Sequence, residues 1–203
     1  MKRVAILLLL LPVIGCADQA PRYLDTIPEF WRTLYPEGGE GLYCGERFAR
    51  FDRDYNIEHV YPMAWVTREL RCGDRQQCRR HSDRFNTIES DMHNMYPARK
   101  DLNKSRGSWP FRELKGERHI ERGCDLEIDR RARAVEPRPE VRGDIARAML
   151  YMADQYGLTL FERQRRDLER WHRQDPPSDF ERRRNELIES AQGRRNHWID
   201  AAS

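Results

Sequence analysis

The chain has 203 residues, of which 35% are charged and 38% hydrophobic, and its formal net charge is +3. This length suffices for one domain with a sizeable hydrophobic core, and the sequence contains neither an internal repeat nor a long linker. The net charge is small, so overall charge alone gives no evidence that the chain binds nucleic acid.

The N-terminus is predicted to be an export signal. Lys2 and Arg3 precede an apolar run over residues 4–14, which is too short to span a bilayer but fits the hydrophobic region of a secretory signal. The run ends in Val-Ile-Gly-Cys, which is typical of a bacterial lipobox, so Cys16 would be acylated and become the first mature residue. Ordinary signal cleavage after Ala17 is the alternative.

These signals predict a location outside the cytosol. We expect residues 1–15 to be cleaved as a lipoprotein-type signal peptide, residues 16–24 to form a tether and residues 25–200 to form the folded domain. The predicted location is the periplasm or cell envelope, where a lipid on Cys16 would attach the protein to the outer membrane. Secretion is the alternative if that lipid is absent.

The first half of the domain is predicted to be irregular. Apolar spacing predicts a helix over residues 27–34. Short strands are expected over residues 41–44 and 57–61, on either side of the polar motif described below. A further helix is expected over residues 86–94, and Pro97 is expected to stop it.

The last third is predicted to be helical. Apolar residues recur with helical spacing from Ile145 to Tyr156, and Gly157 stands where a glycine commonly ends a helix. Thr159-x-x-Glu162 and Ser178-x-x-Glu181 have the pattern of capping boxes that open two more helices. The apolar side chains of these helices are predicted to be core rather than a ligand site: Ala148, Met149, Met152, Leu168, Trp171, Phe180, Leu187, Ile188 and Ala191.

Four cysteines remain after Cys16 is set aside, and in an exported chain an even number predicts two disulfides with three possible pairings. The short spacing of Cys72 and Cys78 favours a local pair, which leaves Cys44 with Cys124. A zinc site is the competing interpretation, although its spacing matches no familiar finger; its ligands would be Cys72, Cys78, His81 and His93.

Positive charge is concentrated in one segment. Residues 68–84 contain six arginines against three acidic residues. The guanidinium fork of arginine matches phosphate geometry better than the ammonium of lysine does. The alternative is that these arginines only line solvated helix faces.

A carboxylate and an imidazole are adjacent at Glu58 and His59, and an amide follows at Asn103. Carboxylate and amide oxygens suit Mg²⁺, and an imidazole can take a proton from water near neutral pH. Adjacent residues of a strand point to opposite faces, so the pair can serve one site only at a strand end or kink, which Pro62 would favour. The alternative is a surface glutamate beside a half-buried histidine.

Four blocks in order resemble the bacterial endonuclease I family of periplasmic and secreted nonspecific nucleases, from about residue 42 to about residue 199. The blocks are Glu58-His59-Val60-x-Pro62-x-Ala64-Trp65, the segment 89–97, Asn103-x-x-Arg106-Gly107 and the segment 142–158. The chain departs from the family pattern at Lys104, at Ser108 and near residues 193–199. None of these departures removes a residue of the polar motif.

This resemblance implies a single α+β domain with a ββα-metal (His-Me finger) core and several packed helices. It also implies that Glu58 and Asn103 hold one Mg²⁺ ion, with other divalent cations as alternatives. His59 would be the general base, Arg75 would stabilise the phosphate, and Glu89 would orient His59 through its side chain or its backbone carbonyl.

The implied activity is sequence-nonspecific cleavage of DNA, with RNA as a further candidate, by a monomer. Two alternatives stay open. One is a catalytically silent envelope lipoprotein of the same fold that binds nucleic acid or a partner. The other is an unrelated hydrolase of small phosphoesters, which is disfavoured because the sequence lacks a second Asp and His cluster for a two-metal site.

Overall fold

The computed structural model describes residues 20–50, 52–116 and 120–200. The predicted signal peptide, the lipobox and Cys16 therefore lie outside the described residues. Within the described ranges, none of the helices has both the length and the apolar character needed to cross a bilayer.

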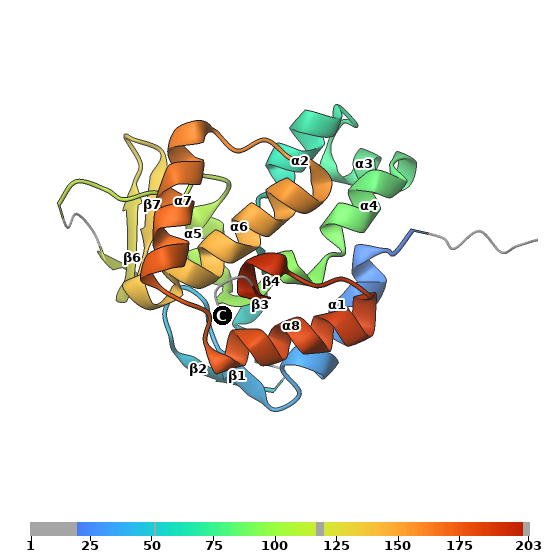
Figure 1. Ribbon diagram of the computed structural model, residues 1–203, viewed down its shortest axis with the longest axis horizontal. Helices are drawn as coiled ribbons and strands as arrows, with labels where there is room; N and C mark the ends of the chain where they lie inside the picture. Colours follow the sequence, from blue (N-terminus) through green and yellow to red (C-terminus); the bar gives the residue numbers. More distant parts are fainter. Residues whose placement is uncertain (1–19, 51, 117–119, 201–203) are drawn as a thin grey trace, which may run out of the picture.

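The fold is a mixture of helices and small antiparallel sheets, which confirms the predicted α+β class (Figure 1). The first half contains α1 (Tyr23–Leu34), β1 (Gly38–Glu40), β2 (Arg47–Ala49), β3 (Tyr55–His59), α2 (Met63–Leu70), α3 (Arg75–His81), α4 (Asp83–Glu89), η1 (Met92–Asn94), β4 (Met95–Arg99) and α5 (Lys100–Arg106). The second half contains β5 (Ile120–Glu121), β6 (Cys124–Asp129), β7 (Ala134–Pro137), η2 (Pro139–Val141), α6 (Arg142–Tyr156), α7 (Glu162–Gln174), α8 (Asp179–Gln192) and α9 (His197–Asp200).

A ββα unit lies at the centre of the molecule. Strands β3 and β4 pair antiparallel, with Glu58 opposite Tyr96 and His59 opposite Met95. Helix α5 begins directly after β4 and packs against both strands. The two strands do not form a tight hairpin, because α2, α3, α4 and η1 lie between them in the sequence.

The core surrounds α6, which crosses the middle of the molecule with α7 packed along it (Figure 1). Every residue of α6 from Ile145 to Ala153 is buried, as expected of a helix enclosed on all sides. A second apolar cluster, which includes Phe30, Phe48 and Ile188, joins α1 and the β1–β2 sheet to α8. The ββα unit therefore rests on helices from both ends of the chain.

Several predicted elements of the first half change in the structure. The helix predicted over residues 27–34 is confirmed, but α1 starts earlier, so Tyr23 and Leu24 belong to its first turn and not to a tether. Residues 42–44 form a turn, so the predicted strand is wrong; the Leu42 amide donates to the Pro97 carbonyl instead. The helix predicted over residues 86–94 ends at Glu89, and Pro97 lies within β4.

The C-terminal helices agree more closely. Gly157 and Gly193 adopt the left-handed conformation after α6 and α8, and Ser178 forms the predicted capping box. The box predicted at Thr159 is wrong, because α7 starts after Phe161 and the Thr159 amide and hydroxyl donate to the Glu69 carboxylate. Phe180, predicted to be core, is 52% exposed, and Ala191 is exposed as well.

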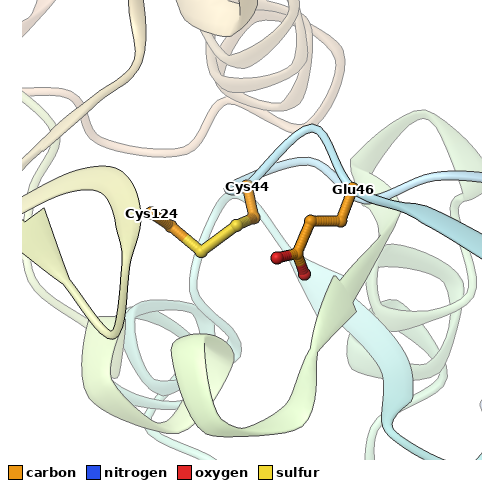
Figure 2. A group of neighbouring side chains, drawn as sticks. All are labelled: Cys44, Glu46 and Cys124. Carbon is orange, nitrogen blue, oxygen red and sulfur yellow. A yellow bond between two sulfur atoms is a disulfide. The ribbon is translucent and has the colours of Figure 1, made fainter.

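Both predicted disulfides are present, Cys44–Cys124 and Cys72–Cys78. The zinc interpretation is therefore wrong, because both of its thiols are oxidised. Figure 2 shows the first bond with the Glu46 side chain beside it. Disulfide sulfurs are not thiolate ligands, so this group is not a metal site either. Arg99 fills the space there, with one guanidinium nitrogen 3.2 Å from the Glu46 carboxylate.

Candidate active site

Glu58 and His59 lie at the end of β3, which is the position that the sequence required for both to serve one site, although the strand predicted over residues 57–61 continued two residues further. His59 is the last residue of the strand, and Pro62 occupies the N-cap position of α2 three residues later. Asn94 fixes the backbone that follows β3. Its side-chain oxygen accepts from the Tyr61 amide at 2.6 Å, and its side-chain nitrogen donates to the Tyr61 carbonyl at 3.0 Å. The strand end therefore has a fixed backbone from which both side chains reach one pocket.

The imidazole of His59 is buried and makes one hydrogen bond within the described part of the chain. Its Nε2 lies 2.9 Å from the backbone carbonyl oxygen of Glu89. Burial, with a smaller contribution from the Arg75 guanidinium, lowers the pKa of His59 from its ordinary value to about 4. The ring is thus neutral near pH 7 and able to accept a proton.

The Glu58 carboxylate is held by two donors. The Tyr43 hydroxyl at 2.7 Å and the Arg106 guanidinium at 2.8 Å both donate to Oε1, while Oε2 accepts no hydrogen bond from the described residues. Burial raises the pKa of Glu58, and the nearby Arg106 charge opposes that shift. The carboxylate is therefore fixed in place with one oxygen left for a ligand.

Asn103 lies on α5 and reaches back to β3. Its side-chain nitrogen donates to Asn56 Oδ1 at 2.9 Å and to the Ile57 carbonyl at 3.3 Å. Because a carbonyl can only accept, the Ile57 contact shows that the NH₂ end of the Asn103 amide faces β3. The amide oxygen is therefore left for other partners. Asn103 therefore offers a neutral oxygen to the same pocket.

Arg75 is the first residue of α3, inside the loop that Cys72–Cys78 closes. A capping box of Asp74 and Gln77 fixes the start of this helix. Arg75 donates to one oxygen of the Glu89 carboxylate, and Arg79 donates to both. Of the two expected ways for Glu89 to contact His59, only the backbone carbonyl is used, since the carboxylate binds the arginines.

These groups line one pocket with a volume of about 610 Å³. Its walls include Glu58, His59, Arg75, Asn103 and Tyr23. All the site residues predicted from the sequence except Glu89 reach this pocket, and Glu89 lies behind His59 and Arg75. Ser108, one of the departures from the family pattern, lines the pocket too, and its carbonyl accepts from the Trp65 indole at 2.9 Å.

Sequence reasoning missed four residues of this site: Tyr23, Tyr43, Arg79 and Arg106. Helical spacing in the sequence pointed to two of them, because Arg106 lies one turn after Asn103 and Arg79 lies one turn after Arg75. The contacts of Tyr23 and Tyr43 are made between segments far apart in the chain, and no local pattern marks them.

The donor set fits a hard divalent cation. One carboxylate oxygen and one amide oxygen are available in the pocket, and the guanidinium of Arg75 is near enough to influence the Glu58 pKa. Two protein ligands leave coordination positions for water and a phosphate oxygen, which is the usual way proteins bind Mg²⁺ beside a phosphate.

A ββα unit with a histidine at the end of its first strand and an amide on its helix defines an α+β nuclease fold of the ββα-metal type. The sequence model of the Endonuclease I family matches residues 32–203. The chain belongs to the endonuclease I family, and it is therefore a nuclease, a hydrolase of nucleic-acid phosphodiesters.

Curated relatives agree with this assignment. An extracellular deoxyribonuclease of Aeromonas hydrophila is 40% identical over 164 residues, which cover 79% of this chain and 70% of the relative. A periplasmic deoxyribonuclease of the same species is 38% identical over 147 residues, 70% of this chain and 62% of the relative. An extracellular ribonuclease of Bacillus subtilis is 30% identical over 168 residues, 72% of this chain and 51% of the relative. The matches thus span between 51% and 70% of the length of these relatives.

Proposed function

We propose that this protein is a Mg²⁺-dependent endonuclease that cuts DNA, and RNA as a second substrate, without reading base sequence. One observation carries the proposal: the His59 imidazole lines the same pocket as Arg75 and two oxygens, one on Glu58 and one on Asn103, that accept no hydrogen bond from the described residues. The assignment of Mg²⁺ rests on the hardness of these two oxygens together with their small number, since Mg²⁺ keeps several water ligands beside a phosphate whereas Ca²⁺ usually takes about six to eight oxygen ligands.

In the proposed reaction His59 acts as the general base. Its Nε2 donates to the Glu89 carbonyl, so Nδ1 holds the lone pair that takes a proton from the attacking water. Arg75 stabilises the negative charge that develops on the phosphate. Mg²⁺ held by Glu58 and Asn103 would supply further charge stabilisation to the phosphate and the departing oxygen.

The substrate class follows from the kind of groups in the pocket. These groups can contact a phosphate and a water molecule, and contacts to phosphates do not depend on the base sequence of a nucleic acid. Deoxyribonucleases and ribonucleases are both among the relatives, which supports DNA as substrate and RNA as a second one. We propose that the protein acts as a monomer.

We further propose that the protein works in the periplasm or cell envelope, anchored to the outer membrane by a lipid on Cys16. Extracellular and periplasmic relatives support export, and two disulfides fit an oxidising compartment. Mass spectrometry of the mature N-terminus tests the anchor, because ordinary signal cleavage would leave no acylated Cys16.

A nicking assay on supercoiled plasmid tests the activity. We expect cleavage with Mg²⁺ and none with EDTA, at many sites and on unrelated plasmids. Binding should weaken steeply between low and physiological salt, because phosphate contacts depend on counterion release. A folded protein that binds DNA but never nicks it with any divalent cation would instead be the catalytically silent lipoprotein.

A further inference from the structure

Tyr23, the first residue of α1, lies in the active-site pocket although it precedes the residues that the family model matches. Its side chain is partly buried, and its hydroxyl makes no hydrogen bond to any residue that the structure describes. The contacts of Tyr23 are therefore made by the faces and edges of its ring.

The Tyr23 ring contacts both the proposed general base and the arginines beside it. Its centroid lies 5.0 Å from the centroid of the His59 imidazole, with the two planes tilted by 53°. The guanidinium carbons of Arg75 and Arg79 lie 5.5 Å and 5.1 Å from the Tyr23 centroid, within the range of cation–π attraction. One aromatic ring thus touches the base and both arginines that Glu89 holds.

The backbone near Tyr23 is fixed to the site. The Ser90 hydroxyl, next to Glu89, donates to the Pro21 carbonyl at 3.2 Å. Later in α1, Thr26 and Phe30 are buried, and the helix packs against α8. The position of the Tyr23 ring is therefore a fixed feature of the fold.

We propose that Tyr23 is a positioning residue of this active site: its ring holds the His59 imidazole and the Arg75 guanidinium in their working orientations. The hydrogen bond to Glu89 fixes only one atom of the imidazole, and an adjacent ring face restricts rotation about it. Arg75 is 45% exposed, and the Tyr23 ring adds a second restraint to its ion pair with the Glu89 carboxylate, so it has fewer rotamers available. A ring without a hydrogen bond restrains both groups and does not compete for the proton. This inference rests on the proposed function.

Steady-state kinetics of two Tyr23 variants test the role. Tyr23→Phe keeps the ring and should keep at least half of the wild-type kcat. Tyr23→Leu keeps apolar volume but loses the flat face, and we expect kcat to fall about 10- to 100-fold, the scale of loss for a misplaced catalytic group. KM should rise by less than kcat falls, because the Glu89 carboxylate still holds Arg75 and Arg79 in this variant. Leu24→Ala is the matched control, because Leu24 is in the same helical turn and is 66% exposed.

Thermal melting of each variant accompanies the kinetics, and Tyr23→Met replaces Tyr23→Leu if the latter is unfolded at the assay temperature. An unchanged or raised kcat in the folded variant overturns the positioning role. Equal losses in Tyr23→Phe and Tyr23→Leu also overturn it, because the hydroxyl would then be the active group. A wild-type protein without metal-dependent cleavage overturns the proposed function and this inference with it, whereas an active wild type with a fully active Tyr23→Leu overturns this inference alone.

Discussion

The Nε2 atom of His59 lies 2.9 Å from the backbone carbonyl oxygen of Glu89. A carbonyl can only accept, so Nε2 carries the proton and Nδ1 is the basic nitrogen. The partner is main chain, and no substitution of the Glu89 side chain removes it. The Glu89 carboxylate has a separate task, since it binds Arg75 and Arg79.

Glu89→Gln should therefore impair phosphate binding more than proton transfer. Glutamine has one acceptor oxygen where glutamate has two, and it lacks the negative charge that pairs with Arg75 and Arg79. The backbone contact between residue 89 and His59 stays. We expect KM to rise about tenfold and kcat to fall less, measured on a defined DNA duplex. A large loss of kcat at unchanged KM would contradict this division of roles. Asp83→Asn, in the same helix α4 but outside the contacts of the site, is the control.

His59→Ala and Glu58→Gln should fail in different ways. His59→Ala removes the base, so we expect a loss of about 10²- to 10⁴-fold in kcat with DNA affinity retained. Glu58→Gln keeps the shape of the side chain but weakens the metal site, so it should lose metal affinity as well as activity. Metal titration by calorimetry and DNA binding by fluorescence anisotropy distinguish the two. A His59→Ala protein with near wild-type turnover would refute the assignment of the base.

The activity should persist at lower pH than an ordinary histidine allows. An unperturbed imidazole becomes protonated below about pH 6.5 and can no longer accept a proton. Burial lowers the His59 pKa to about 4, so the neutral base persists as pH falls through 6.5 and is lost only near 4. The measurement is kcat against pH at saturating Mg²⁺, because protonation of Glu58, whose pKa is raised by burial, competes with the metal. An acid limb at 6.5 would show that His59 is solvated in the working enzyme.

Arg106→Ala should strongly destabilise the fold. It leaves the Glu58 carboxylate, 3% exposed, without its charged partner, which typically costs about 3–5 kcal/mol of unfolding free energy. Arg130→Ala is the control: its side chain is 64% exposed and pairs with Glu121 at 3.5 Å, so we expect a loss below about 1 kcal/mol. Urea unfolding measures both. Equal stabilities would mean that the buried pair adds nothing to the fold.

The two disulfides should have different effects when replaced by serine pairs. Cys44–Cys124 joins residues 80 apart, and loop entropy assigns such a link about 4 kcal/mol. Cys72–Cys78 spans only 6 positions and is worth about 2 kcal/mol by the same relation, but it encloses Arg75. We expect the first replacement to lower stability and the second to weaken DNA binding. Fully active exported protein with four free thiols would contradict both expectations.

The sequence predicted those parts of the site that depend on local pattern. Pro62 indicated that the strand ends before residue 62, although the predicted end at residue 61 lies two residues beyond the observed end at His59, and the spacing of Cys72 and Cys78 indicated their bond. Local pattern failed at Thr159, where the carboxylate of Glu69, 90 residues away, takes the place of the predicted cap. The helical spacing from Asn103 pointed to Arg106 but not to its partner Glu58, because pairing across 48 positions depends on how β3 and α5 pack.

The ββα unit is completed by residues far beyond it. Arg184, on α8, donates to the carbonyls of Met92 in η1 and of Met95 at the start of β4, and Gln192 bonds the backbone of Ser90 and Met92. Every side chain assigned to chemistry has been synthesised by residue 103, yet these donors follow at least 80 positions later. A nascent or truncated chain that lacks α8 therefore leaves the carbonyls at Met92 and Met95 without their partner. We expect the nuclease to gain activity only after α8 has been synthesised.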